Sequence, residues 1–224
     1  MENKKKNLDN IVNNLLLRKK ENPSALFEEL HNIWREEIGE KNKFSCQCIQ
    51  ELNDKHCIDI CLLGVHAIDN GFNCWGIFFM LQDAIPKINN NIDSIIQLFE
   101  RFHKSMQGDL ASGQQYLPVE QLTKEQPIFA RQLLDKLLAG PAAFSVGYIS
   151  TIFCSLSEQD KTNIHNELLS LTHNESVYVV QAAINALGRL DYQLSKDQKI
   201  LEDSLQALYF SSVLFKRSIL IILF

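Results

Sequence analysis

Side chains that could bind a metal ion concentrate between residues 44 and 66. This segment, FSCQCIQELNDKHCIDICLLGVH, contains four cysteines and two histidines, at Cys46, Cys48, His56, Cys57, Cys61 and His66. Zinc sites use four nitrogen or sulfur ligands; Cys57 and Cys61 lie four residues apart, and Cys46-x-Cys48 could supply the second pair. The competing interpretation is a helix whose apolar stripe includes these thiols, because cysteine packs as a small hydrophobic residue. We expect the packed arrangement, with no metal or other cofactor.

A cysteine nucleophile is a second chemistry that the residue types permit. Cys154 could act with His165 or His173, because a thiolate needs a nearby base. However, Cys154 lies among Ile152, Phe153 and Leu156, which favours a buried structural thiol. The sequence also contains no glycine-rich phosphate loop, HExxH or GxSxG motif. We therefore expect no catalytic residues and, more generally, no enzyme.

Composition limits the partners and the compartment. The chain has 224 residues, 46% of them hydrophobic, and a net charge of −5 with acidic and basic residues intermixed, so no basic track for nucleic acid is expected. The cysteines lie in apolar helical stretches and the N-terminus has no export segment, which together predict a cytoplasmic protein. The apolar run Ile219 to Phe224 is far shorter than the roughly 20 residues that span a bilayer.

Apolar residues recur at intervals of three and four, which predicts helices and no sheet. Asn22 and Pro23 separate the first two helices, with Ser24 as the expected N-cap. We predict one long loop, residues 107–123, in which Tyr116 and Leu117 could form an apolar anchor for a partner. The predicted helices are Leu8 to Arg18, Ser24 to Ile38, Phe44 to Leu52, Lys55 to Ile68, Phe72 to Ile85, Ile92 to Met106, Lys124 to Ala139, Ala142 to Ser155, Glu158 to Leu171, Ser176 to Leu190, Lys196 to Tyr209, and Val213 onward.

The second half of the chain repeats its apolar pattern. Ile164, Leu168, Leu171 and Val177 recur 37 residues later as Leu201, Leu205, Leu208 and Leu214, and Ile149 and Ile152 recur 35 residues later as Ile184 and Leu187. Periods of this length are typical of stacked helix pairs.

The segment NESVYVVQAAINALGRLD, residues 174–191, resembles the first helix of a HEAT repeat of the short bacterial, lyase-associated type. The residues that carry the resemblance are Val179, Ala182, Ala183, Ala186, Leu187, Gly188 and Leu190; Val180 departs from it, because the family often has arginine there. The resemblance implies an all-α, right-handed α-solenoid of antiparallel helix pairs. The resemblance covers only the C-terminal half, where residues 91–224 would form degenerate repeats. Residues 1–90 are expected to form an N-terminal helical region, either separate from the solenoid or continuous with it.

A solenoid of this kind implies a scaffold or adaptor that binds a protein partner. The alternative is a HEAT-like enzyme or nucleic-acid-binding protein, of the DNA base-excision type or the small-molecule lyase type. In the predicted register the last repeat is incomplete. We therefore expect either a chain that continues or self-association through the C-terminal helix, whose interaction surface would include Leu214, Phe215, Ile219 and Ile222.

Overall fold

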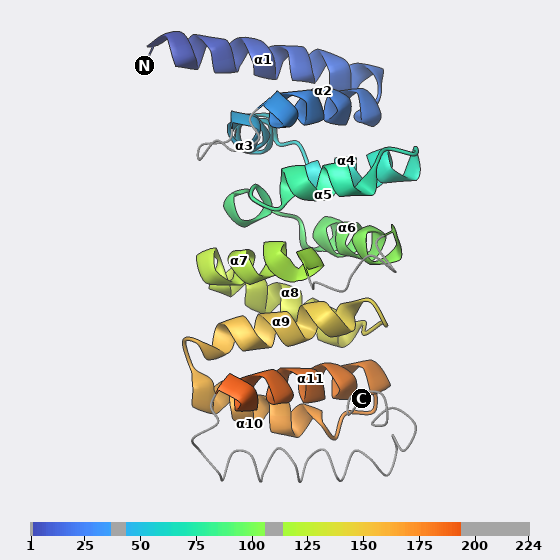
Figure 1. The fold of residues 1–224 in the computed structure, drawn as a ribbon, viewed down its shortest axis with the longest axis vertical. Helices are drawn as coiled ribbons and strands as arrows, with labels where there is room; N and C mark the ends of the chain where they lie inside the picture. Colours follow the sequence, from blue (N-terminus) through green and yellow to red (C-terminus); the bar gives the residue numbers. More distant parts are fainter. Residues whose placement is uncertain (1, 37–43, 106–113, 194–224) are drawn as a thin grey trace. The chain divides into compact units, whose positions relative to one another are not determined.

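The computed structural model describes residues 2–36, 44–105 and 114–193, and within these residues the protein is all-helical, as predicted. The described residues contain eleven α-helices and two short 3₁₀ helices and no strand (Figure 1). The elements are α1 (Glu2–Glu21), α2 (Pro23–Glu36), α3 (Phe44–His56), α4 (Ile60–Asp69), α5 (Cys74–Leu81), η1 (Ile85–Lys87), α6 (Ile92–Ser105), η2 (Gln114–Tyr116), α7 (Leu117–Glu125), α8 (Pro127–Ala139), α9 (Ser145–Ser157), α10 (Lys161–Leu171) and α11 (Val177–Gln193).

The chain divides into two compact units, Met1–Glu125 and Gln126–Phe224. The division lies later than the expected boundary after residue 90. The reason is that α6 packs against α4, and α7 packs against η1, so both helices belong to the first unit.

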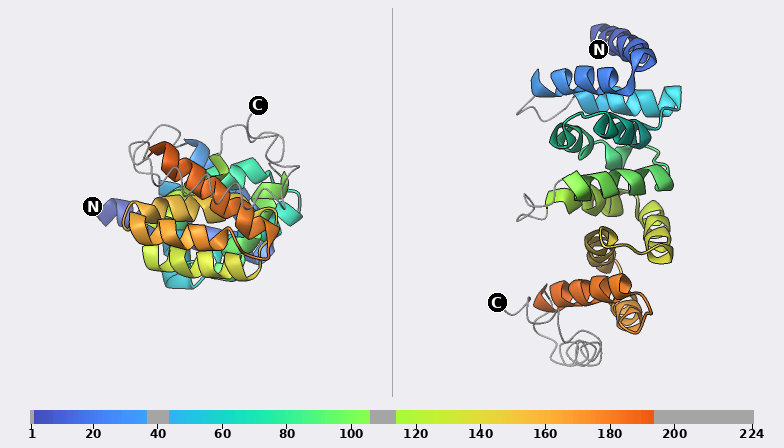
Figure 2. Two further views of the ribbon diagram at one scale, coloured as in Figure 1. Left: turned by 90° about the horizontal axis from the view of Figure 1, so that it is seen from below. Right: turned by 90° about the vertical axis from the view of Figure 1, so that its right-hand side faces the viewer.

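In the first unit, helices two apart along the chain lie next to each other. Helix α4 contacts α2 on one side and α6 on the other, and α1 contacts α2 and α3. Two directions of view show these helices following one another in chain order (Figures 1 and 2). The core between them is made of fully buried apolar side chains, among them Leu26, Phe27, Leu30, Ile49, Leu52, Phe78, Leu98 and Phe102.

In the second unit, α9 is the central helix, with α8, α10 and α11 packed around it. The small side chains Ala182, Ala183 and Ala186 of α11 are fully buried, and α11 packs closely along α9 because alanine allows two helices to approach. Arg131 of α8 makes a two-pronged ion pair with Glu167 of α10, with N–O distances of 2.8 and 2.5 Å. The alanines that carry the family resemblance therefore lie in the contact between α11 and α9.

Asparagine and proline set several helix ends. The backbone N–H of Ala25 donates to Asn22 Oδ1 at 2.6 Å, so Asn22 caps α2, which begins at Pro23; the predicted cap, Ser24, was wrong. Helix α4 ends at Asp69, one residue after the predicted Ile68, and Asn70 and Gly71 follow it. Gly71 has φ of +90°, a conformation that glycine tolerates, and Phe72 N–H donates back to Ala67 O.

The predicted loop at residues 107–123 was too long. Residues 114–116 form η2 and residues 117–123 belong to α7, which begins at Leu117 and has Pro118 in its first turn, where proline is tolerated. Pro127 is the first residue of α8, so the single helix predicted from Lys124 to Ala139 is two helices.

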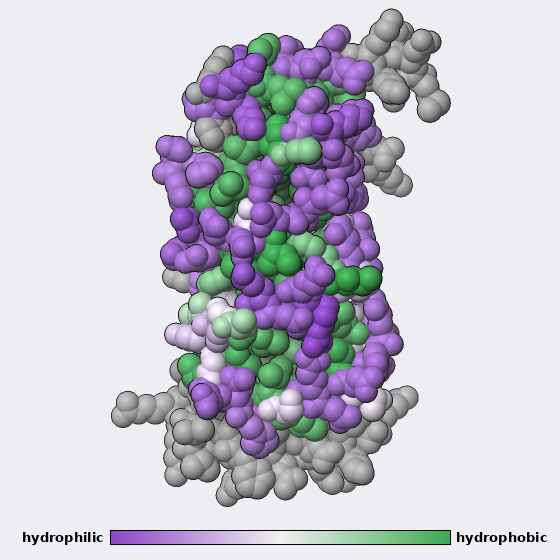
Figure 3. Space-filling view, turned by 180° about the vertical axis from the view of Figure 1, so that it is seen from behind, coloured by the Kyte–Doolittle hydropathy of each residue, from purple (hydrophilic) through white to green (hydrophobic). Residues whose placement is uncertain are grey.

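Hydrophilic side chains cover much of the face drawn in Figure 3, with hydrophobic patches between them, as expected for amphipathic helices.

Candidate functional site

The cysteines considered as metal ligands do not come together. Cys46 Sγ donates to the Asp83 carbonyl at 3.6 Å and Cys61 Sγ to Asn90 Oδ1 at 3.4 Å, while Cys48 is fully buried and Cys57 is exposed. Among the described residues no group of three or more histidine, cysteine or acidic side chains could hold a metal ion. The four cysteines therefore do not form a zinc site, because Cys46 and Cys61 contact different residues, Asp83 and Asn90.

Cys61 illustrates why the thiols are structural. Its burial, and secondarily the negative charge of Asp59, raise the pKa of the thiol far above its usual range. Asp59 caps α4 by accepting the Leu62 N–H at 2.9 Å, and it also accepts the Ser94 hydroxyl at 2.6 Å. The thiol thus stays protonated beside a fixed carboxylate, which is unsuitable for a nucleophile or a metal ligand.

The alternative cysteine nucleophile is not assembled either. Cys154 Sγ points to the Ala186 carbonyl at 3.9 Å, in the contact of α9 with α11. Neither ring nitrogen of His165 has a hydrogen-bond partner, and His173 Nδ1 lies 3.2 Å from Thr172 Oγ1 and 3.3 Å from the Leu169 carbonyl. Neither histidine is therefore bonded to the thiol that it would have to activate.

The interaction residues predicted from the sequence have mixed positions. Tyr116, in η2, is half-buried, and Leu117, the first residue of α7, is 42% exposed, so this pair offers only a small apolar surface. Leu214, Phe215, Ile219 and Ile222 lie outside the described residues, as does the repeat of the pattern beyond residue 193.

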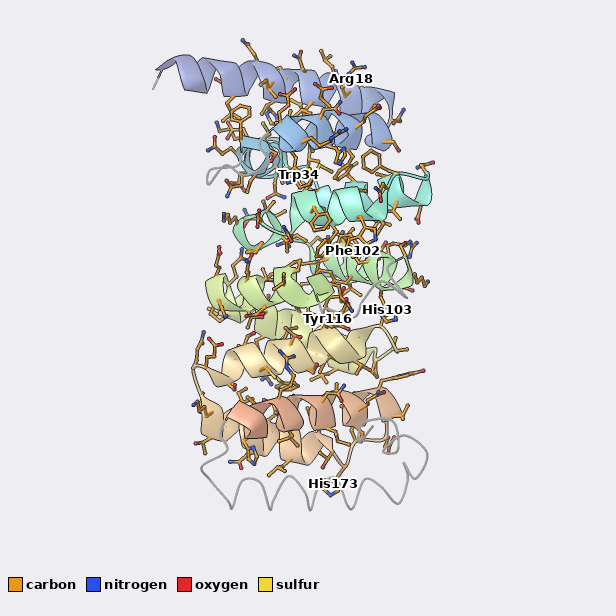
Figure 4. The ribbon with its side chains drawn as sticks, viewed as in Figure 1. Arg18, Trp34, Phe102, His103, Tyr116 and His173 are labelled. Carbon is orange, nitrogen blue, oxygen red and sulfur yellow. The ribbon has the colours of Figure 1, made fainter. Side chains whose placement is uncertain are left out.

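A different surface stands out in the first unit: five half-buried rings from two helices and a turn. We call it the aromatic surface, and it consists of His31 and Trp34 of α2, Phe72 in the turn before α5, and Trp75 and Phe79 of α5. It contains both tryptophans of the chain. Figure 4 shows Trp34 between α2 and the layer of α4 and α5.

Helical spacing brings these rings into line. His31 and Trp34 are three residues apart and Trp75 and Phe79 four apart, so each pair lies on one face of its helix. Asn73 fixes the start of α5, because its Oδ1 accepts the Trp75 N–H at 3.1 Å.

The rings form one stacked row across the two helices. The ring of His31 stacks on Trp34 with centroids 5.6 Å apart and planes 22° apart. Trp34 stacks on Phe79 at 6.1 Å and 7°, and Phe79 on Trp75 at 5.7 Å and 27°. Phe72 meets His31 edge-on at 6.0 Å and 86°. Such offset and edge-to-face contacts are the favoured aromatic geometries.

The row is anchored in the core through Phe79. The ring centroids of Phe79 and the fully buried Phe78 are 5.4 Å apart, and those of Phe78 and Phe102 are also 5.4 Å apart. Figure 4 shows Phe102 on α6. Gly76 makes room for the row, because a Cβ at this position would lie 3.3 Å from the imidazole of His31. The aromatic surface is thus packed against the core.

The polar atoms of the row remain available. The ring nitrogens of His31, Trp34 and Trp75 form no hydrogen bond within the described part of the chain. These nitrogens are not fully buried, so water reaches them. Burial, and then the positive charge of Arg35, lower the pKa of His31, so its imidazole is neutral near pH 7. Arg35 itself is exposed and has no ion pair in the described residues.

This surface was not predicted from the sequence. The sequence did contain a local signal, namely two pairs of aromatic rings at helical spacing. One pair is His31 with Trp34, and the other is Trp75 with Phe79, where Gly76 follows Trp75. Nothing in the sequence showed that α2 and α5 are neighbours.

Comparison of the chain with protein-family models, curated proteins and solved structures finds no match. Among the described residues no helix combines the length and the apolar character needed to cross a bilayer.

Proposed function

We propose that this protein is a scaffold or adaptor that binds a protein partner through the aromatic surface. The single observation that supports the proposal is the stacked row of two tryptophans, a phenylalanine and a histidine that stays half-exposed although it is anchored in the core. Tryptophan is enriched among the residues that carry binding energy at protein interfaces. A rigid row also costs little conformational entropy when a partner binds.

The architecture we propose for it is a right-handed HEAT-like α-solenoid. Two packing relationships support this arrangement: α4 lies between α2 and α6 in the first unit, and α11 lies along α9 in the second. Contacts between alternate helices are what stacked helix pairs produce. We also propose a cytoplasmic location, which the six free cysteines support because reducing compartments keep thiols unpaired.

The enzyme alternative has little support from the described residues. Cys154 Sγ donates to the Ala186 carbonyl, and the thiol of Cys61 is buried and protonated. We therefore carry forward the binding function alone.

Selection from a phage-displayed library of random short peptides tests the proposal. The wild-type protein and a Trp34→Ala, Trp75→Ala double variant would be immobilised side by side. We expect a peptide family that is enriched on the wild type and lost on the double variant. Circular dichroism and urea unfolding would establish that the double variant is folded at the selection temperature, and the single variant Trp75→Gln would replace it if it is not.

Tyr178→Ala is the matched control, because it removes an exposed aromatic ring from the second unit, far along the chain from the aromatic surface. It should retain the selected peptides. The proposed function is wrong if the wild type enriches no peptide family, or if the double variant enriches the same family equally well.

A further inference from the structure

The aromatic surface presents hydrogen-bond donors in excess of acceptors. The two indole N–H groups of Trp34 and Trp75 can only donate, and both are unpaired and reached by water. Arg35, one residue after Trp34, adds a guanidinium that has no ion pair in the part of the chain that the structure describes. A ligand that complements this set must bring acceptors.

The rings modify this picture only slightly. Aromatic rings carry negative potential on their faces and positive potential on their edges. Trp34 contacts the rings of His31 and Phe79, which cover part of its electron-rich faces. The indole N–H groups and Arg35 therefore favour an anionic group.

The field at His31 has the same sign. Within the described residues, Arg35 is the charged group that lowers the pKa of the His31 imidazole, although Glu28 and Glu36 lie on the same helix.

We propose that the aromatic surface binds an acidic peptide segment, with a carboxylate at Arg35 and the indole N–H groups and a neighbouring apolar side chain against Trp75 and Phe79. This inference rests on the proposed protein-binding function and names the chemistry of the partner. A carboxylate fits because a guanidinium can bind it through two parallel hydrogen bonds. Burial of the adjacent apolar side chain against the rings would add hydrophobic stabilisation.

A peptide fits this surface better than a nucleic acid does. Tight binding of a phosphate backbone requires several cations along a track. Here a single arginine is flanked along α2 by the exposed carboxylates Glu28 and Glu36, which would repel a polyanion. A short segment with one or two carboxylates can reach Arg35 without approaching them.

Fluorescence anisotropy with two labelled peptides tests the inference. A consensus peptide from the selection described above would be synthesised with glutamate, or with glutamine, at its acidic positions. We expect the wild-type protein to bind the glutamate peptide at least about tenfold more tightly, equivalent to about 1.4 kcal/mol. Arg35→Gln should remove most of this preference, and Arg35→Glu should reverse it. Raising the ionic strength should weaken binding of the glutamate peptide only.

Lys161→Gln is the control for net charge, because it also removes one positive charge, from an exposed position on α10. It should leave the preference intact. Replacing both indoles with Trp34→Phe and Trp75→Phe keeps the rings but deletes the N–H donors, and should reduce the preference without abolishing binding of the glutamine peptide.

Failure of the inference is distinguishable from failure of the proposed function. If the selected peptides carry no acidic residues, or if the glutamate and glutamine forms bind equally well, the surface binds peptides and the acidic preference is wrong. If a labelled oligothymidylate binds more tightly than the glutamate peptide and depends on Arg35, the partner is a nucleic acid and the inference is overturned. If no peptide is selected at all, the proposed function itself is wrong.

Discussion

Trp34 of α2 and Phe79 of α5 stack with their ring planes 7° apart and their centroids 6.1 Å apart, although 44 residues separate them in the sequence. This contact joins two helices that are not consecutive. It also completes the row that runs from His31 to Trp75.

Replacement of Trp34 by alanine should lower the free energy of unfolding by about 1–3 kcal/mol, somewhat less than for a fully buried aromatic side chain. The variant loses the stacking contacts with His31 and Phe79 on either side of the ring. Urea unfolding followed by circular dichroism would measure the change. Tyr178→Ala, at a more exposed site, should cost less than about 0.5 kcal/mol, and equal losses in the two variants would contradict the stacked arrangement.

Two glycine-to-alanine replacements should differ in their effect on stability. Gly188 lies inside α11 with nothing within 4 Å of an added Cβ, so Gly188→Ala should raise the free energy of unfolding by about 0.5–1 kcal/mol. Gly76 is also helical, but an added Cβ would lie 3.3 Å from the His31 ring. Gly76→Ala should therefore gain less, or lose stability. Equal gains in thermal or urea unfolding would show that His31 does not pack on Gly76.

Stability should depend on pH through His31. Burial and Arg35 lower the pKa of this imidazole in the folded state, so the unfolded chain binds the proton more tightly. Well above the ordinary histidine pKa of about 6.5, His31 is neutral in both states and does not affect the stability. As the pH drops through and below that value, protonation favours the unfolded chain, so the free energy of unfolding falls.

His31→Phe keeps a ring in the row and removes the titrating group. Urea unfolding between about pH 8 and pH 5 should show the wild type losing more stability than this variant as the pH falls. Parallel curves for the two proteins would contradict a histidine that is buried in the neutral form.

Thiol reactivity should separate the cysteines. Cys57 is exposed, whereas Cys48 and Cys61 are buried and burial raises the pKa of Cys61 far above its usual range. Under native conditions iodoacetamide should modify Cys57 first, and Cys61 should react only when the protein unfolds. Mass spectrometry of digested samples would show the order in which the cysteines are modified. Modification of Cys61 as fast as Cys57 would show that α4 is not packed as described.

The sequence by itself determined the helical class and many of the element limits. Apolar residues at intervals of three and four can bury one side of a helix and no side of a strand, and that information is local. Asn70 and Gly71 likewise end α4 by hydrogen bonds within a few residues. Small side chains on one helix face, such as Ala182, Ala183 and Ala186, likewise indicate a face that packs against a neighbour, and all three are buried.

Where local rules compete, the sequence was less informative. Ser24 and Asn22 can both cap a helix, and the geometry of the chain before Pro23 favours Asn22. Residues 117–123 look polar enough for a loop, but Val119 and Leu122 are buried once η1 lies against α7, and this burial stabilises a helix.

Only the tertiary structure decided which side chains form the candidate site. Cys46 and Cys61 could equally bind a metal or fill a core, and the choice depends on Asp83 and Asn90, which follow them by 37 and 29 residues. The aromatic surface depends in the same way on the packing of α2 against α5. Periodicity fixes which face of each helix is apolar, but the partner of that face is fixed by contacts between distant residues, which no local pattern encodes.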